Sequence, residues 1–513
     1  MDLNMYPNNV VNIADKKVSP QSIMFGHRIK SAQSRMEYLV EFLALAISKK
    51  RIKGDAEYQS KIFIVDDRCA EKTIEYIPQS NMGLKRFIFF YNSKADTKAS
   101  IDEEAAKKCI EIIKECISCG TNELSIKECV SALQTILYDF SIENTGRSWF
   151  NKNILPVCPE VLFPEALGRK KLRDEVDLDS DNLDSNFDFN SYTYQCRGGE
   201  IYYLHLLQAL NDNTGNSDEY RLAIERGIKN MLNSMAQISE LCKFIQKKWI
   251  DGNESLRVRG DSQPDVKKTT GAIPYDFSLR NREVVEELAN FFRCNINPME
   301  QMDILGYGII LQLLRAMFST ATKRIGAKDE AWVLDLCGNN VKEKAEIRKL
   351  AGDCYRKNEE VVKKYLNMGI EELCGNYSDE EKYDTYKKAA NDSYKLFRKL
   401  AKDIGVMIPL KGDEMRFTLS ENIIKFLVMS LIPPSNKITF DLFLDLMYEH
   451  FSMIVTPEHY TMALRDGKVS ANENVSFLHA NKDEFCQKLK DCGFLRDLSD
   501  ATAIVENVYE GCE

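Results

Sequence analysis

Between residues 200 and 403, apolar residues recur at helical spacing in one segment after another. This pattern predicts helices at about 200–210, 217–235, 236–250, 280–293, 298–320, 328–336, 340–375 (broken) and 378–403. No segment repeats at a fixed period, which argues against a solenoid of regular units. A chain of 513 residues is too long for one core, because domains usually hold about 100–200 residues. We therefore expect a mainly α, multidomain protein whose helical middle spans residues 200–404.

The N-terminal part is more mixed. Residues 1–22 resemble a loose arm without an apolar signal core, and Ser31 or Ser34 is placed to cap an apolar helix. KIFIVDD (61–67) and LKRFIFFYNSK (84–94) are short and rich in β-branched or aromatic residues, which is typical of strands. Helices are predicted at 102–119 and 124–140. Together these segments predict a small mixed α/β domain over residues 23–167.

A strongly charged segment follows. Residues 168–190 hold four basic residues and then seven acidic ones, with few apolar groups to bury. Asp177, Asp179 and Asp181 alternate as at the start of a calcium loop, but no glycine stands at the sixth position and position twelve is Asp188 instead of Glu. We expect residues 168–199 to be a solvated loop or linker.

The turn Arg197-Gly198-Gly199-Glu200 connects that linker to an apolar helix. Backbone amides before a helix can cradle an anion, and Arg197 could assist. However, the chain lacks a Walker motif, and Glu200 already offers a negative charge to the helix dipole. We favour a hinge in which Gly198 and Gly199 supply unusual backbone angles, with anion binding as the alternative.

Two groups of side chains are candidates for catalysis. Asp66 and Asp67 end a predicted strand, and with Glu75 they could hold Mg²⁺ as in nucleases, although TIEYIP lacks the lysine that a restriction-type nuclease would place next. Otherwise the aspartates form a helix cap or turn. His27, which follows a glycine in a probable loop, is the best single candidate for acid–base chemistry.

Other chemistry-bearing residues fit structural roles better. His205 lies in an apolar helix and is expected in the core. Cys116 and Cys119 form a C-x-x-C with Cys109 and Cys129 nearby, but no second C-x-x-C completes a zinc site. Cys109 and Cys116 are seven residues apart on one helix face, so we expect both to pack in a core, with no metal or other cofactor.

The C-terminal residues 405–513 carry the clearest order of elements. A helix from Ser420 to the Pro433-Pro434 stop, a short extended piece, a helix capped by Thr439, a helix ending at Gly493 and a two-strand ribbon around Ser499-Asp500 follow one another. This order resembles winged-helix domains, with residues 453–480 as an insertion. The resemblance implies that the third helix would be the one to enter DNA.

The net charge of this C-terminal unit argues against DNA binding. Residues 405–513 contain 10 basic and 17 acidic residues, a net charge of −7, and the third helix is neutral. The whole chain, with 69 basic and 78 acidic residues, has a net charge of −9. Because affinity for DNA phosphates depends on clustered Lys and Arg, we expect this unit to dock onto protein.

The remaining features concern compartment and role. The 15 cysteines lie mostly in apolar helical runs, as reduced cysteines do, which indicates the cytoplasm. No uncharged apolar run reaches the length of about 18 residues that a membrane span needs. The high Lys, Asn and Ile content is typical of AT-rich bacterial genes.

These features resemble accessory subunits of bacterial multi-gene DNA-processing and anti-phage defence systems. The resemblance implies a non-catalytic scaffold or interaction subunit that acts with a separate ATPase, helicase or nuclease. A metal-dependent nuclease using Mg²⁺ and a winged-helix DNA-binding regulator are the alternatives.

Overall fold

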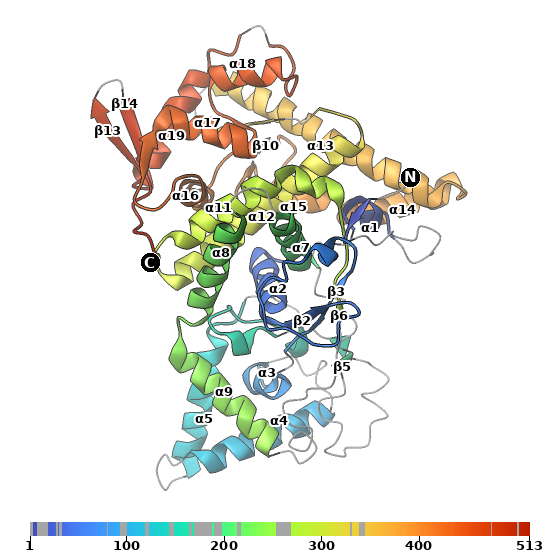
Figure 1. Ribbon diagram of the computed structural model, residues 1–513, viewed down its shortest axis with the longest axis vertical. Coiled ribbons are helices and arrows are strands. Elements are labelled where there is room, and N and C mark those ends of the chain that lie inside the picture. The colour runs from blue at the N-terminus through green and yellow to red at the C-terminus, as the bar shows by residue number, and fades with distance from the viewer. Residues whose placement is uncertain are drawn as a thin grey trace.

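In the computed structural model the chain is mainly helical, with a few short sheets (Figure 1). The residues described are 4–7, 19–26, 29, 33–79, 81–92, 100–117, 123–142, 148–163, 167–168, 187–188, 197–212, 217–252, 268–328, 331–337, 344–472, 474–499 and 502–512. The α-helices are α1 (Pro20–Phe25), α2 (Arg35–Ile47), α3 (Met82–Phe89), α4 (Ser100–Cys116), α5 (Glu123–Tyr138), α7 (Gly198–Asn211), α8 (Ser217–Leu232), α9 (Ala236–Asp251), α11 (Asn281–Arg293), α12 (Pro298–Arg324), α13 (Ala345–Cys374), α14 (Asp379–Asn391), α15 (Tyr394–Asp403), α16 (Glu421–Leu431), α17 (Phe440–Phe451), α18 (Pro457–Arg465) and α19 (Leu478–Asp491).

Short 3₁₀ turns and strands connect these helices. The 3₁₀ turns are η1 (Asp67–Ala70), η3 (Trp149–Asn151), η4 (Pro159–Val161) and η6 (Tyr275–Arg280). The strands are β1 (Met5–Tyr6), β2 (Lys49–Ile52), β3 (Ile74–Ile77), β4 (Leu167–Gly168), β5 (Phe187–Asp188), β6 (Lys268–Thr269), β7 (Ile273–Pro274), β8 (Trp332–Val333), β9 (Met407–Ile408), β10 (Arg416–Phe417), β11 (Lys437–Thr439), β12 (Met453–Ile454), β13 (Leu495–Ser499) and β14 (Thr502–Glu506). Two sheets are three-stranded, in the orders β2-β3-β6 and β11-β14-β13.

The centre of the molecule is built around α12. This helix is long and apolar enough to cross a membrane by length and composition, but 94% of its most apolar stretch is buried within the protein. Asn297 caps its start by accepting a hydrogen bond from the Met299 amide at 2.9 Å, and Pro298 occupies its first turn. α2, α13, α15 and α16 pack on it, so α12 is the core helix of the chain.

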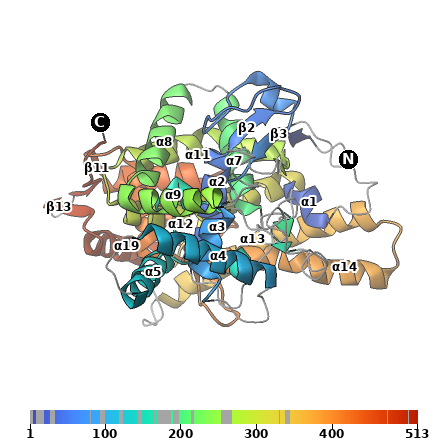
Figure 2. The ribbon, with the colours of Figure 1, turned by 90° about the horizontal axis from the view of Figure 1, so that it is seen from below.

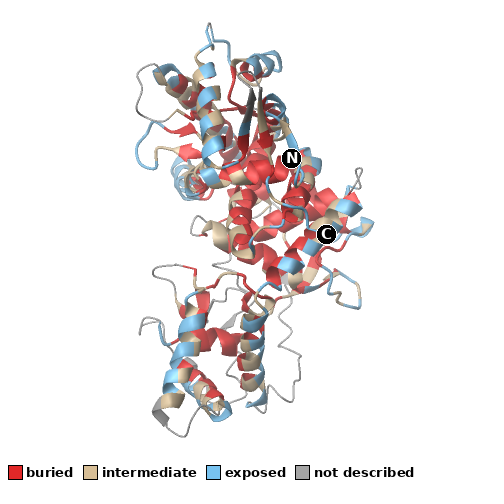
Figure 3. Cartoon of the chain, turned by 90° about the vertical axis from the view of Figure 1, so that its left-hand side faces the viewer, coloured by how far each residue is buried: buried red, intermediate tan, exposed pale blue. Residues whose placement is uncertain are grey.

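A separate lobe lies at the lower end of Figures 1 and 3 and is seen from below in Figure 2. Its own hydrophobic core combines residues 82–163 with Cys242, Ile245 and Trp249 of α9. α3 crosses the middle of this lobe and contacts α4, α5 and α9. The lobe therefore needs α9, which follows it by more than seventy residues in the sequence.

The main core does not follow the domain boundaries expected at residues 167 and 404. One cluster of buried side chains extends from Tyr6 through α2, α7, α11 and α12 to Val505 of β14. β12 also pairs in parallel with β8, which ties residues 453–454 to residues 332–333. The C-terminal elements therefore pack onto the central helices and share one hydrophobic core with them.

Two predicted strands are wrong. Residues 84–89 lie in α3, which is buried all round, so that no polar stripe shows the helical period in the sequence. Residues 61–66 are irregular because side chains satisfy their carbonyls: Lys50 Nζ donates to Lys61 O at 2.6 Å, and the Tyr203 hydroxyl donates to Ile62 O at 2.9 Å. Within the small mixed α/β domain predicted over residues 23–167, β2 and β3 form a sheet whose third strand, β6 (Lys268–Thr269), lies outside that range.

Three further predictions also need correction. The segment 328–336 is not a helix, since Trp332–Val333 forms β8. The helix expected to be broken within 340–375 is continuous over Ala345–Cys374. Residues 1–22 are not all a loose arm, because buried Met5 and Tyr6 pair with β7 and Pro20–Phe25 forms α1.

Candidate functional site

The turn that the sequence marks as an anion site or hinge forms the first turn of α7. Arg197 is the N-cap residue and takes a left-handed conformation, with φ of 56°. Gly198 and Gly199 are already helical, so the unusual backbone angle falls on the arginine and not on the glycines. The interpretation of the glycines as suppliers of unusual angles is therefore wrong.

The glycines are needed because α7 crosses α2 at very close range. A Cβ atom on Gly199 would clash with the carbonyl oxygen of Tyr38 and lie 2.5 Å from the amide nitrogen of Phe42. A Cβ atom on Gly198 would overlap the Tyr38 ring. Gly198 and Gly199 thus permit helix packing, a role that glycines have wherever backbones must approach closely.

A carboxyl group of the protein itself occupies one amide of this helix N-terminus. The Gly199 amide donates to Glu41 Oε2 at 2.9 Å, and Gln33 Nε2 donates to the same oxygen at 2.9 Å. Glu200 Oε1 accepts a hydrogen bond from the Gly271 amide at 2.7 Å. The same carboxylate oxygen lies 3.5 Å from Arg197 Nη1. Burial raises the pKa of Glu41 to about 7, and the nearby charge of Glu200 adds to this rise.

Two of the three carboxylates proposed for Mg²⁺, Asp66 and Glu75, are engaged in ion pairs, and the third, Asp67, is exposed at the start of η1. Asp66 caps η1 by accepting from the Arg68 amide at 2.9 Å, and its carboxylate pairs with the Arg68 side chain at 2.8 Å. Glu75 lies on β3 and pairs across the sheet with Arg51 at 2.8 Å. In the part of the chain that the structure describes, no group of three or more His, Cys, Asp or Glu side chains could hold a metal ion.

Several other candidates fall outside the described residues or in the core. His27, Cys119, Asp177, Asp179 and Asp181 lie outside the described residues. His205 is buried with its ring edge-on to Phe277, and burial lowers its pKa to about 3, so the ring is neutral. Cys109 is buried as expected, whereas Cys116 is exposed and does not pack in the core.

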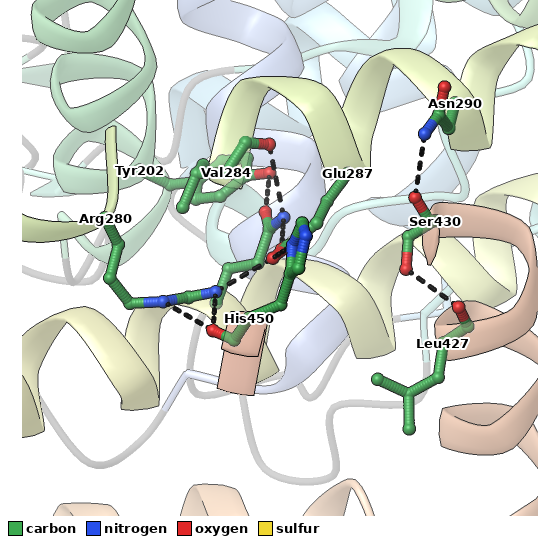
Figure 4. Close-up of polar contacts among 9 residues, drawn as sticks. Tyr202, Arg280, Val284, Glu287, Asn290, Leu427, Ser430 and His450 are labelled. Carbon is green, nitrogen blue, oxygen red and sulfur yellow. Dashed lines mark hydrogen bonds and ion pairs between the residues drawn. The ribbon is translucent and has the colours of Figure 1, made fainter. Parts of the chain in front are cut away.

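A buried polar network that the sequence did not single out connects α7, α11, α12 and α17 (Figure 4). Its centre is Glu287 of α11, which is fully buried. Glu287 Oε1 accepts from Arg280 Nη2 at 2.9 Å and lies 3.0 Å from His450 Nδ1. Glu287 Oε2 accepts from Gln312 Nε2 at 2.7 Å, and the Tyr202 hydroxyl donates to Gln312 Oε1 at 2.6 Å. Both carboxylate oxygens are therefore satisfied.

His450 forms the outer end of this network. Burial lowers its pKa, but the hydrogen bond to Glu287 and the charge of that carboxylate outweigh burial and leave the pKa raised. Glu287 holds Nδ1, and none of the described residues hydrogen-bonds to Nε2. A histidine held in this way can carry a positive charge or exchange a proton through Nε2.

The network borders a surface cleft of about 460 Å³. The cleft lies where η6, the last turn of α12 and the last turn of α17 meet the residues after α18. Its charged lining residues are Arg280, Glu283, Arg315, Lys323, Glu449, His450 and Lys468. Arg280 and His450 therefore belong both to the buried network and to the wall of the cleft.

A signal for this site is present in the sequence. Glu287 stands in VVEELANFF, among residues of α11 that are otherwise buried and apolar, such as Val284, Leu288 and Phe291. Gln312 and Arg315 likewise interrupt the apolar run GIILQLLRAMF of α12. Because buried polar side chains need partners, these interruptions predict a network, although the sequence does not show which residues meet.

No family model, curated protein or solved structure matches the chain.

Proposed function

We propose that the chain is a non-catalytic interaction subunit of a bacterial DNA-directed complex, such as an anti-phage defence system, and that it acts in the cytoplasm. In this proposal its C-terminal residues form a winged-helix-like unit that docks onto another protein. The partner would be an ATPase, a helicase or a nuclease. The free thiols of the described cysteines are consistent with a reducing compartment.

The observation that carries the proposal is the order of elements after residue 420. α16, β11, α17, α19 and the ribbon β13–β14 follow one another, and β14 lies between β11 and β13 in an antiparallel sheet. α18 (Pro457–Arg465) is the insertion between the second and third helices. Helix, strand, two helices and a ribbon in one sheet support a winged-helix-like unit.

The charges around α19 favour a protein partner over DNA. Lys482 pairs with Asp441 of α17 at 2.6 Å, and Glu484 pairs with Lys344 at 3.3 Å. Charges that are already paired within the protein release fewer counterions on binding DNA. Leu442, on the same α17, is 45% exposed and offers an apolar contact to a protein partner.

The metal-dependent nuclease receives less support from the geometry. A metal ion at Asp66 or Glu75 would have to replace the ion pairs with Arg68 and Arg51. Plasmid incubated with the full chain and Mg²⁺ or Mn²⁺ separates the two functions. We expect that the wild-type chain does not cleave the plasmid. Cleavage by wild type that is lost in the Asp66→Ala variant would refute the proposal of a non-catalytic subunit.

The DNA-binding regulator is tested by a gel shift of the full chain over a range of salt concentrations. We expect weak binding without sequence preference. Saturable binding to one DNA sequence, lost when Lys488 and Lys490 are replaced by glutamate, would support the regulator instead.

A further inference from the structure

The cleft beside His450 has an unusual balance of charge. Four lysine and arginine side chains and His450 line it, against two carboxylates, and a third carboxylate, Glu287, lies behind Arg280 and His450. The lysines, the arginines and His450 come from η6, α12, α17 and the loop after α18: Arg280, Arg315, Lys323, His450 and Lys468. A cleft lined mostly by one sign of charge focuses its field and concentrates counter-ions.

Two of these cations are held in the wall. Arg280 is 6% exposed and Arg315 is 1% exposed. Arg280 Nη1 has no hydrogen-bond partner among the described residues, although Nε and Nη2 bind the His450 carbonyl at 3.2 and 2.7 Å. The Arg315 guanidinium lies 4.6 Å from the centre of the Trp332 ring. Fixed guanidinium groups lose little entropy when an anion arrives.

The two lysines of the cleft line its outer part. Lys323 is exposed in the last turn of α12, and Lys468 is half-buried with its ammonium 5.2 Å from the Tyr448 ring. Neither forms an ion pair with a residue in the described ranges, although Glu283 and Glu449 line the same cleft. Both ammonium groups are therefore available to an anion.

Capping of helix ends explains only part of this cluster. Cations near helix C-termini stabilise the terminal carbonyls, and Arg280 does so for α17. In α12, however, backbone amides already occupy the last carbonyls: the Ala327 amide donates to Thr322 O at 3.0 Å, and the Gly326 amide donates to Lys323 O at 3.1 Å. Lys323 and Lys468 are therefore not needed to satisfy the carbonyls at the helix ends.

We propose that this cleft binds the phosphate group of a small phosphorylated molecule, with Lys323 and Lys468 contacting the phosphate and Arg280 and His450 forming the wall behind it. The volume of about 460 Å³ lies within the range of small-molecule sites. The charge requires an anion, and lysine and arginine together are the residues that proteins use for phosphate. This site goes beyond the proposed docking function and does not depend on it.

Isothermal titration of the full chain at constant ionic strength tests the proposal. The probes are inorganic phosphate, AMP and ATP, each titrated into wild type and into a double variant, Lys323→Glu with Lys468→Glu. We expect saturable binding to wild type and an affinity at least about tenfold lower in the double variant. Tighter binding of AMP or ATP than of phosphate would identify a nucleotide as the source of the phosphate group, and equal binding would identify free phosphate.

The matched control is a second double variant, Lys247→Glu with Lys437→Glu, which makes the same change of net charge outside the cleft. Lys247 lies on α9 and Lys437 on β11, and both are exposed. We expect it to bind as wild type does. Circular dichroism checks that each variant is folded, and Lys323→Gln with Lys468→Gln replaces the glutamate pair if that pair unfolds. Absence of saturable binding to wild type, or equal losses in the cleft and control variants, would overturn the proposal.

Discussion

The amide of Gly199 donates a 2.9 Å hydrogen bond to Oε2 of Glu41, a buried carboxylate on the neighbouring helix α2. The N-terminus of α7 therefore holds a carboxyl group, and that group is a side chain of the same protein. The contact also explains the two glycines, because only a residue without Cβ lets α7 approach α2 closely enough. Helix packing and charge are thus satisfied at one point, and both parts can be tested separately.

Replacing Gly199 with alanine tests the packing. The added Cβ would meet backbone atoms of Tyr38 and Phe42, which cannot move as a flexible side chain can. We expect the free energy of unfolding to fall by about 1–3 kcal/mol, measured by urea denaturation. The control is Gly352→Ala on α13, where the nearest atom to the new Cβ would be 3.8 Å away. That change should be neutral or stabilise by up to about 1 kcal/mol, and equal losses would contradict the packing role.

The pH dependence of stability tests the protonation of Glu41 in the folded protein. The pKa of Glu41 is raised from 4.5 to about 7 in the folded protein, mainly by burial. The folded protein therefore keeps a proton that the unfolded chain releases, so this group lowers the free energy of unfolding as pH rises through that interval. The full effect is about 3 kcal/mol and is reached above the folded pKa.

Glu41→Gln should remove this dependence while keeping an acceptor for the Gly199 amide. Urea unfolding at several pH values from 5 to about 8 should show a wild-type curve that falls relative to the variant. Glu111→Gln, at an exposed position on α4, is the control and should follow wild type. Parallel curves for wild type and Glu41→Gln would show that burial does not shift this carboxyl.

The network around Glu287 should matter more for stability than the surface ion pairs. Glu287→Ala leaves the buried guanidinium of Arg280 without its carboxylate, so we expect a loss of about 3–5 kcal/mol in the free energy of unfolding. Adding Arg280→Met should recover part of that loss, because the buried guanidinium without a carboxylate is then removed. Glu371→Ala breaks a surface pair with Lys382 and should cost less than about 1 kcal/mol. Similar losses in Glu287→Ala and Glu371→Ala would contradict this ranking.

Helical periodicity in the sequence correctly predicted helices that keep one polar face, such as α8 and α11. α11 was expected at 280–293 and runs over Asn281–Arg293, and the ribbon around Ser499 was predicted as a pair of strands that the structure has as β13 and β14. Periodicity failed for α3, where Lys85 and Arg86 are buried with the apolar residues and leave no exposed stripe. It also failed at Trp332–Val333, whose strand depends on a partner more than a hundred residues away.

The candidate sites show the same limit. The sequence identified Arg197, Gly198 and Gly199 as a special turn, but it did not show that Glu41 fills it. It identified Asp66 as a cap or metal ligand, and the structure shows the cap. Glu287 and His450 are 163 residues apart in the chain, and no spacing in the sequence indicates that they meet. Long-range packing alone assembles that site.

Affinity purification of the full chain from its source cells, with mass spectrometry of what co-purifies, tests the interaction subunit most directly. We predict a stoichiometric ATPase, helicase or nuclease partner. The Leu442→Asp variant on α17 should lose this partner, and the Leu222→Asp variant, at an exposed position on α8, should retain it. A chain that purifies without any such partner, or a partner that both variants retain equally, would contradict docking through the C-terminal unit.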